Sequence, residues 1–310
     1  MNRRMKILLT GGSGMVGRNL LDHATAATHE VVAPSSKVLD LTDKQAVALY
    51  IADLQPDLVI HAAGRVGGIH YNSAYQTEAL VDNIEMGMNV VMAARDAGVP
   101  RLLNLGSSCM YPRDAPNPLS EDLILSGKPE PTNEGYAIAK IAVARLCLYV
   151  SRARPTLRYK TLIPCNLYGV YDKFDPNVSH LVSAVIAKVH DARVNGRETV
   201  DIWGDGTARR EFLFAGDLAD AVWASVERFD DLPDLMNVGC GSDYSVNEYY
   251  EAVARVLEWD GGFTHDLSKP VGMQRKLVAT DRQAAFGWSP RHSLDEGIRL
   301  TYDHYLTIGH

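Results

Sequence analysis

The amino-acid sequence predicts an α/β fold in which a doubly wound parallel sheet carries a smaller, discontinuous α/β lobe. Short apolar runs alternate with helical stretches over the first half of the 310-residue chain, as expected of parallel strands whose connecting helices cover both faces of a sheet. A glycine-rich turn at 11–17 follows the first apolar run. After Asn166 the alternation is interrupted by Gly, Asn and Pro residues, which indicates that the chain leaves the sheet there.

The individual elements follow from the apolar periodicity in chain order. The predicted strands of the sheet are 6–10, 30–33, 57–62, 101–105 and 159–164. The helices predicted between or after them are 15–27, 44–54, 77–97 and 134–150. A helix at 218–228 and a strand at 235–238 return the chain to the sheet, whereas helices at 246–257 and 294–305 belong to the smaller lobe.

This order divides the chain into two units. Residues 1–165 and about 212–240 form the predicted nucleotide-binding domain, and about 166–211 with 241–310 form the second lobe. A cleft between two lobes is where a ligand is expected.

Composition and charge exclude several classes of protein. With 46% hydrophobic and 22% charged residues and no long apolar run, the chain is expected to be soluble, with no membrane segment. Its net charge of −7 argues against nucleic acid as a partner. The ten histidines include no His-x-x-x-His pair, so no metal site is expected. No export signal is visible, and four scattered cysteines favour reduced thiols in the cytoplasm.

The glycine-rich turn predicts a dinucleotide site. Glycine permits the tight turn and lets backbone amides approach a pyrophosphate, while the N-terminus of the next helix attracts the anion. The residues expected to contact the cofactor here are Gly11, Gly12, Ser13, Gly14, Met15, Val16 and Gly17. An ordinary glycine turn is the alternative, and the strand before and the helix after it argue against that.

The end of the second strand favours NADP over NAD. An acidic residue there would bind the ribose 2′-hydroxyl and repel a 2′-phosphate, but this chain has Ser36 and Lys37 instead. An exposed loop lysine is the alternative reading of Lys37. Asp40 and Leu41 are expected to border the adenine. The lone His61 at the third strand's end is expected to be a packed histidine rather than a catalyst.

A Tyr-x-x-x-Lys pair, Tyr136 and Lys140, predicts proton transfer. Residues four apart share one face of a helix, so the ammonium can favour the ionised form of a phenol whose reference pKa is about 10. Ser107, at the end of an upstream strand, can then hold a carbonyl oxygen against Tyr136. Taken alone, the spacing is common on amphipathic helices, where a half-buried Tyr lies beside an exposed Lys.

Longer strings carry a family resemblance. They are Val66-Gly67-Gly68-Ile69, Gly106-Ser107-Ser108-Cys109-Met110-Tyr111-Pro112, Glu130-Pro131-Thr132-Asn133-Glu134, Tyr136-Ala137-Ile138-Ala139-Lys140, Asn166-Leu167-Tyr168-Gly169 and Arg210-Glu211-Phe212-Leu213. Over nearly the whole chain they resemble the extended short-chain dehydrogenase/reductase family, and within it the GDP-L-fucose synthase branch. The resemblance implies a Rossmann-type domain and a bifunctional enzyme that uses NADPH. Its substrate would be GDP-4-keto-6-deoxy-D-mannose, which is epimerised at C3 and C5 and then reduced at C4 to GDP-L-fucose.

The resemblance also implies roles for single residues. Cys109 and His180 stand at the family's epimerase positions, as the base and the proton donor. On the residues alone, Cys109 can equally be a buried small hydrophobe, and His180 can merely cap or line the following helix. The residues that the family places at the cofactor in this half of the chain are Leu105, Gly106, Lys140, Pro164, Asn166, Leu167 and His180.

A GDP-sugar carries a pyrophosphate, so the second lobe should offer cations. The expected substrate contacts are Ser107, Ser108, Cys109, Lys188, Trp203, Arg210 and Lys276, with Arg209 and Arg275 as neighbouring candidates. A strand tryptophan such as Trp203 is as often part of a core. One departure from the family is Lys269-Pro270-Val271-Gly272, which lacks the family's acidic residue after Lys-Pro.

Other functions remain open at this point. A sister enzyme would act on another GDP-linked 4-keto sugar, such as a 6-deoxyheptose or a 3,6-dideoxy sugar, and a non-catalytic NADP-binding regulator is a third reading. The family commonly forms homodimers through paired helices. In the 134–150 helix, Ile141, Val143 and Leu146 are candidates for such an interface, or equally for the core.

Overall fold

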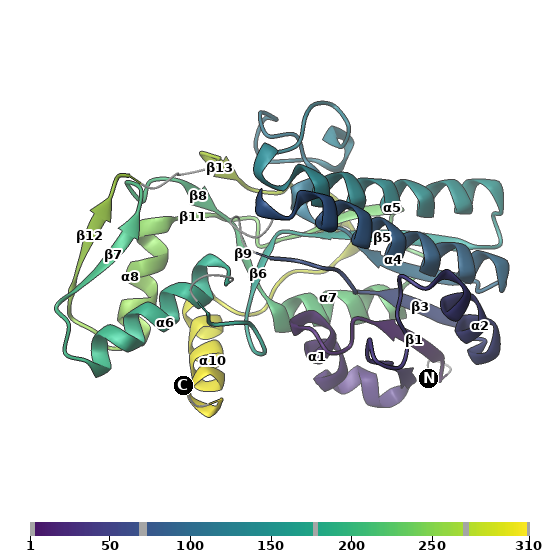
Figure 1. The fold of residues 1–310 in the computed structure, drawn as a ribbon, viewed down its shortest axis with the longest axis horizontal. Coiled ribbons are helices and arrows are strands. Elements are labelled where there is room, and N and C mark those ends of the chain that lie inside the picture. Colours follow the sequence, from purple (N-terminus) through teal and green to yellow (C-terminus); the bar gives the residue numbers. More distant parts are fainter. Residues whose placement is uncertain (1–3, 68–72, 176–178, 269–272, 309–310) are drawn as a thin grey trace.

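The computed structural model describes residues 4–67, 73–175, 179–268 and 273–308. At its centre is a six-stranded sheet of order β10-β5-β4-β3-β1-β2, in which every pairing is parallel (Figure 1). The strands are β1 (Lys6–Thr10), β2 (Glu30–Val32), β3 (Leu58–His61), β4 (Arg101–Leu105), β5 (Arg158–Pro164) and β10 (Leu235–Val238). The predicted α/β fold is confirmed, including the late strand that returns to the sheet.

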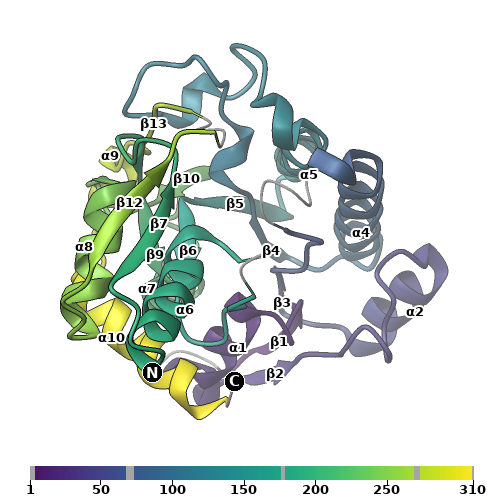
Figure 2. The ribbon, with the colours of Figure 1, turned by 60° about the vertical axis from the view of Figure 1, so that its left-hand side comes forward.

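Helices cover both faces of this sheet because its strands are apolar on both sides. Leu8 of β1 packs in a core with α2 (Lys44–Leu54), α4 (Gln76–Asp96) and α5 (Glu134–Ala153). Its neighbours Ile7 and Leu9 point the other way, into a core with α1 (Met15–Asp22) and α7 (Ala215–Glu227). Figure 2 shows α4 and α5 side by side on one face of the sheet. Successive side chains of a strand point to opposite faces, so the continuous apolar runs fit a doubly covered sheet.

The predicted helix at 15–27 is wrong in its second half. The α-helix ends at Asp22, and His23 adopts an extended conformation with φ −68° and ψ 138°. The His23 ring then accepts a hydrogen bond from the Thr25 amide and caps a 3₁₀ helix, Ala24–Thr28. Buried Ala26 fixes this short helix against the core. A local side-chain cap therefore interrupts what the apolar pattern presents as one helix.

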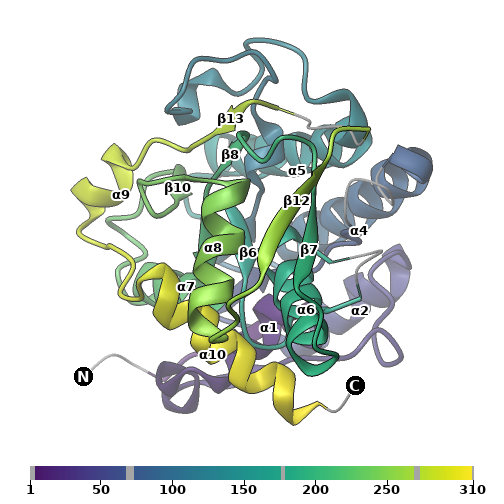
Figure 3. The same cartoon turned by 90° about the vertical axis from the view of Figure 1, so that its left-hand side faces the viewer.

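The second lobe has a core of its own, built around two helices and a two-stranded ribbon. α6 (Leu181–Val194) and α8 (Val246–Val256) pack together with β7 (Thr199–Trp203) and with α10 (Leu294–Thr307). β7 pairs in parallel with β12 (Gly262–Asp266), as Figure 3 shows beside α6 and α8. β6 (Asn166–Tyr168) pairs with β9 (Phe212–Phe214). The predicted boundaries between the nucleotide-binding domain and the second lobe remain a prediction.

Three short strands form a further small sheet in this part of the chain. β8 (Arg209–Arg210) lies between β11 (Tyr244–Ser245), which is antiparallel to it, and β13 (Arg275–Lys276), which is parallel. α9 (Asp281–Phe286) follows. The Lys269–Gly272 departure falls outside the described residues, so the structure does not bear on it.

Two of the three residues proposed for a dimer interface on α5 lie in the core instead. Ile141 and Val143 are 8% and 2% exposed, and each packs against the sheet. Leu146 is half-buried against the same core as Val143. Within the described residues, no helix combines the length and apolar character that crossing a membrane requires.

Candidate active site

A cavity of about 600 Å³ lies at the carboxyl ends of β1, β4 and β5. This edge of a parallel sheet is where ligands bind in doubly wound folds. The predicted residues that line the cavity are Gly11, Gly14, Met15, Val16, Gly17, Leu105, Gly106, Ser107, Ser108, Cys109, Tyr136, Lys140, Pro164, Asn166, Leu167, His180, Arg210 and Lys276. Segments far apart in the chain thus meet around one space.

An adjoining pocket continues from the glycine turn toward the end of β2. Ser13, Ser36, Asp40 and Leu41 line it, which fits the expected adenosine end of a dinucleotide. Gly12 is buried against Ala33, where an added Cβ would lie 2.8 Å from the Ala33 Cβ. Lys37 is exposed and lines neither the cavity nor this pocket. Its contact with a 2′-phosphate stays a prediction.

The glycine turn has the geometry of an anion cradle. Gly11 has φ +79°, a conformation that favours glycine, and an added Cβ on Gly17 would lie 2.2 Å from the Gly11 carbonyl oxygen. Gly14 caps α1 with no side-chain hydrogen bond. The first backbone amides of α1 therefore face the cavity without a competing side-chain acceptor, as pyrophosphate binding requires.

Tyr136 and Lys140 lie side by side on α5, each 6% exposed. Burial raises the pKa of Tyr136, and the charge of Cys109 adds to this, while a hydrogen bond with Ser107 opposes it. The expectation of a favoured ionised phenol is therefore wrong, because burial is the largest effect on this pKa and it favours the neutral form. A neutral phenol is the form that can donate a proton.

Lys140 is held by the end of β4. Its Nζ donates to the Leu105 carbonyl oxygen at 3.0 Å and lies 5.8 Å from the centre of the Tyr136 ring. Burial lowers the pKa of Lys140 to about 8, so the side chain is mostly protonated at neutral pH. It can present a positive charge beside the tyrosine hydroxyl.

Cys109 receives two donors that the sequence did not connect to it. The Asn133 Nδ2 lies 3.3 Å from the Cys109 Sγ, and the Lys276 Nζ lies 3.6 Å from it. Asn133 directly precedes α5, and its side-chain amide nitrogen is directed at the sulfur. Its role was missed because the motif string that contains it gives no chemical reason for an amide at that position.

His180 lines the cavity from the N-terminal cap of α6. Asp172, which also lines the cavity, interacts favourably with its charge. Burial raises the pKa of Asp172, partly opposed by a hydrogen bond from Ser183. His61 behaves as expected of a packed histidine. Its ring lies 2.8 Å from the Thr10 hydroxyl oxygen, and burial lowers its pKa to about 3, so it stays neutral.

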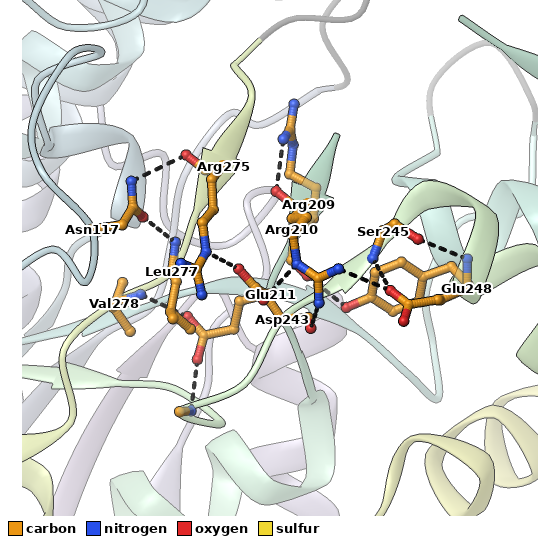
Figure 4. A network of polar contacts seen from close by, with 12 residues as sticks. Asn117, Arg209, Arg210, Glu211, Asp243, Ser245, Glu248, Arg275, Leu277 and Val278 are labelled. Atoms are coloured by element: carbon orange, nitrogen blue, oxygen red, sulfur yellow. Dashed lines mark hydrogen bonds and ion pairs between the residues drawn. The ribbon is translucent and has the colours of Figure 1, made fainter. Parts of the chain in front are cut away.

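The basic residues of the second lobe divide into two sets. Arg210 and Lys276 are register partners on β8 and β13 and line the cavity. Arg209 and Arg275, the other register pair, both bind the buried Asp243, as Figure 4 shows. Burial lowers the pKa of Arg210.

Two predicted substrate contacts lie outside the cavity lining. The Lys188 Nζ donates to the Asp201 carbonyl oxygen at 3.1 Å and lies 5.3 Å from the centre of the Trp203 ring. Trp203 is 43% exposed, so it is not a core residue. Their roles in binding a nucleotide sugar stay predictions. Among the described residues, no group of His, Cys, Asp and Glu could hold a metal ion.

Comparisons with known proteins agree with this geometry. The model of the NAD dependent epimerase/dehydratase family matches residues 7–239. The chain is 51% identical to GDP-L-fucose synthase of Azorhizobium caulinodans, covering 99% of this chain and 98% of that protein. It is 50% identical to GDP-L-colitose synthase of Yersinia pseudotuberculosis, covering 97% and 98%. Among solved structures, the GDP-mannoheptose C4 reductase MlghC from Campylobacter jejuni, with NADP bound, superposes with a TM-score of 0.89 at 28% identity, covering 99% of each chain.

Proposed function

This chain belongs to the NAD dependent epimerase/dehydratase family, and on that premise we propose that it is an NADPH-dependent epimerase-reductase that converts GDP-4-keto-6-deoxy-D-mannose to GDP-L-fucose. One observation carries the proposal. A single cavity holds the reductase set Ser107, Tyr136 and Lys140 together with the epimerase pair Cys109 and His180. A non-catalytic NADP-binding protein would have no use for this combination.

The residues present fit the cofactor. Gly11 and Gly17 allow the close backbone packing of the turn, and Gly14 precedes the first amides of α1, which are suited to a pyrophosphate. Ser36 lines the adjoining pocket and would lie near the ribose. NADPH, when bound, supplies the hydride for the C4 carbon. Lys140 and the segment Pro164 to Leu167 line the same cavity and would hold the nicotinamide end.

Epimerisation comes first and needs two groups on opposite sides of the sugar. The C4 ketone acidifies the hydrogens on C3 and C5, because their removal gives an enolate. Cys109 takes such a proton, and Ser107 and Tyr136 donate hydrogen bonds to the enolate oxygen. His180, which lines the same cavity from the second lobe, would return a proton to the opposite face of the carbon. The configuration of the carbon is then inverted, and because one proton has left and one has been added, the composition of the sugar is unchanged.

Reduction follows at C4 with Tyr136 as the proton donor. Its buried, neutral phenol is in the form that this step requires. As the hydride reaches the carbon, the Tyr136 proton passes to the ketone oxygen, and Lys140 stabilises the tyrosinate that remains. Arg210 and Lys276, which line the cavity from the second lobe, are suited to the pyrophosphate of the GDP group.

The decisive experiment incubates the purified protein with GDP-4-keto-6-deoxy-D-mannose and NADPH in D₂O. We expect NADPH consumption, GDP-L-fucose as the product and solvent deuterium at both C3 and C5. If NADPH is not consumed and no GDP-L-fucose forms, the proposal is wrong. The Tyr136→Phe variant serves as the control for the chemical step, and unchanged turnover in it would remove the role given to Tyr136.

A second candidate is a sister reaction on a GDP-linked 4-keto-3,6-dideoxy sugar. It is favoured by the 50% identity to a protein named GDP-L-colitose synthase, since L-colitose is a 3,6-dideoxyhexose. The same assay separates the two readings. A preference for the substrate without a C3 hydroxyl, with deuterium entering at C5 alone, would identify the sister enzyme.

A homodimer is proposed through the outer face of α4 and α5. Exposed apolar side chains gather there: Val81 and Met88 on α4, and Ile138 and Tyr149 on α5, with exposed fractions of 42% to 53%. The Arg145 Nε on the same helix is buried without a hydrogen-bond partner. We expect Ile138→Glu to elute as a monomer and the wild type as a dimer. Leu49→Glu on α2, a more exposed site on another helix, should stay dimeric.

The four free cysteines support a cytoplasmic location for the reaction, which stays part of this proposal.

A further inference from the structure

We propose that Lys276 holds Cys109 as a thiolate, with Asn133 as its second donor, so that a residue first assigned to the substrate serves the epimerase base. The inference rests on the proposed function for what the thiolate does. It makes Lys276 a positioning residue for Cys109.

Three separate parts of the chain meet at this sulfur. Cys109 lies in the 3₁₀ turn after β4, Asn133 directly before α5, and Lys276 in β13. The Lys276 Nζ is 3.6 Å and the Asn133 Nδ2 is 3.3 Å from the Cys109 Sγ. Both partners are donors, and a sulfur that accepts from both is best matched by a thiolate.

The charges around the sulfur also favour the anion. Tyr136, which interacts with Cys109, is neutral because burial raises its pKa, so it adds no negative charge. The other charged or titratable groups that line the same cavity are Glu130, Lys140, Asp172, Tyr111, Cys165, Tyr171, Lys173, His180 and Arg210. Among the described residues that line the cavity, Lys276 is the cation that contacts the sulfur directly.

A buried carboxylate holds the two strands that carry Arg210 and Lys276, through the arginine that precedes each of them. Asp243, with a side chain 4% exposed, binds the Arg209 Nε at 2.9 Å and the Arg275 Nε at 2.5 Å. Figure 4 shows Arg209 and Arg275 directed at Asp243. Successive residues of a strand point to opposite faces, and Arg210 and Lys276 line the cavity instead. Burial alone would raise the pKa of Asp243, but the two arginines outweigh it and lower the pKa.

The backbone on either side of Lys276 is anchored as well. Asn117 donates to the Arg275 carbonyl oxygen at 3.5 Å and accepts from the Leu277 amide at 2.8 Å. One residue further on, the Val278 amide donates to Glu211 at 2.9 Å. Lys276 thus lies between fixed neighbours. This rigidity is what a positioning role requires.

Alkylation of Cys109 by iodoacetamide tests the proposal without any substrate. The rate is measured across pH by peptide mass spectrometry, which separates Cys109 from the other three cysteines. We expect Lys276→Met to slow the reaction at neutral pH by about tenfold or more, because an opposite charge within ~4–6 Å favours the ionised form by that factor. The rates should converge at high pH. Lys276→Arg should restore most of the rate, and Lys44→Met, which removes an exposed charge on α2, should leave it unchanged.

Asn133→Asp is the second variant, nearly identical in shape but opposite in electrostatic effect. A carboxylate facing the sulfur should slow alkylation at neutral pH, again with convergence at high pH. A wild-type rate profile in both Lys276→Met and Asn133→Asp, with both variants shown to be folded by thermal melting, would overturn the proposal. Lys276 would then be a phosphate ligand alone, and its variant would raise KM for the nucleotide sugar without affecting Cys109.

Failure here and failure of the proposed function can be told apart. If Lys276→Met slows alkylation but the wild type turns over no GDP-sugar, the effect of Lys276 on Cys109 is supported and the proposed reaction is wrong. If the wild type forms GDP-L-fucose but neither Lys276→Met nor Asn133→Asp changes the alkylation rate, the proposed reaction is supported and the role of Lys276 at Cys109 is wrong.

Discussion

At the scale of single residues, burial decides which protons the site can move. Tyr136 stays neutral and Lys140 stays charged at neutral pH, although both are buried and lie on one helix face. This combination favours reduction of a ketone over oxidation of an alcohol, since the enzyme must donate the proton. The protonation of Lys140 is then the step most sensitive to pH.

The pH dependence of reduction should therefore have a descending limb from Lys140. Because burial lowers its pKa to about 8, its charge is present below about pH 8 and is lost above it. We expect kcat/KM for ketone reduction to fall above that pH. Arginine keeps its charge throughout, so Lys140→Arg should move the limb to higher pH, even if its maximal rate is lower. If kcat/KM of Lys140→Arg falls at the same pH as that of the wild type, a group other than Lys140 causes the fall.

Epimerisation and reduction should separate in the Cys109→Ser variant. Loss of a general base typically costs about 10²–10⁴-fold, so deuterium exchange from D₂O into the sugar should fall by about a hundredfold or more. Oxidation of GDP-L-fucose by NADP, which needs no epimerisation, should change by less than about tenfold. Comparable losses in the two assays would contradict the role of Cys109 as the base.

The sequence predicted contacts between residues that are close together in the chain. It did not predict contacts between residues that only the fold brings together. The Tyr136–Lys140 pair follows from one helical turn. The contacts of Cys109 with Asn133 and Lys276 span 24 and 167 residues in the chain, and no spacing rule connects them. Lys188 and Trp203, which were assigned by resemblance, lie near each other on α6 and β7 outside the cavity lining, and their roles stay predictions.

At the scale of elements, long apolar periodicities were predictive and short elements were not. The strands of the sheet were found because most of them, β2 excepted, are buried on two faces. β8 and β13 have two residues each, too few for any period to be visible, yet they orient Arg210 and Lys276. The helix predicted at 15–27 failed because a His23 side-chain bond ends it.

The contact between α4 and α5 depends on a glycine. An added Cβ on Gly87 of α4 would lie 2.3 Å from a methyl carbon of Val143, which is buried on α5. We expect Gly87→Ala to lower the free energy of unfolding by about 1–3 kcal/mol through overpacking. Val143→Ala removes that methyl group, so the double variant should lose less than the sum of the two single losses. Denaturant unfolding of all four proteins measures this coupling, and strict additivity would contradict the steric explanation.

At the scale of the whole molecule, Glu211 joins segments that are distant in the chain. This fully buried carboxylate accepts from the Cys240 amide at 2.6 Å, the Gly241 amide at 3.0 Å and the Val278 amide at 2.9 Å. It therefore ties the start of β9 to the end of β10 and to the segment after β13. Burial raises its pKa to about 7 despite these three bonds.

Stability should accordingly fall as pH rises through this range. Between the ordinary value of 4.5 and about 7, the folded state retains a proton that the unfolded state has lost, so the free energy of unfolding decreases with pH. The total decrease is on the order of 3 kcal/mol for a shift of this size. Glu211→Gln should flatten this slope, even at lower overall stability, whereas Glu251→Gln on the exposed face of α8 should keep it. An unchanged slope in Glu211→Gln would remove Glu211 as its source.

The late strand β10 also has a consequence for biosynthesis. It pairs along β5 from Leu235–Thr161 to Val238–Pro164, so residues 165–234 must be synthesised before the outer edge of β5 has its partner. At about 5–20 residues per second on the ribosome, that edge waits on the order of several seconds. An unpaired apolar strand edge is a template for aggregation. Nascent chains that stall before residue 235 should therefore be the species most dependent on chaperones.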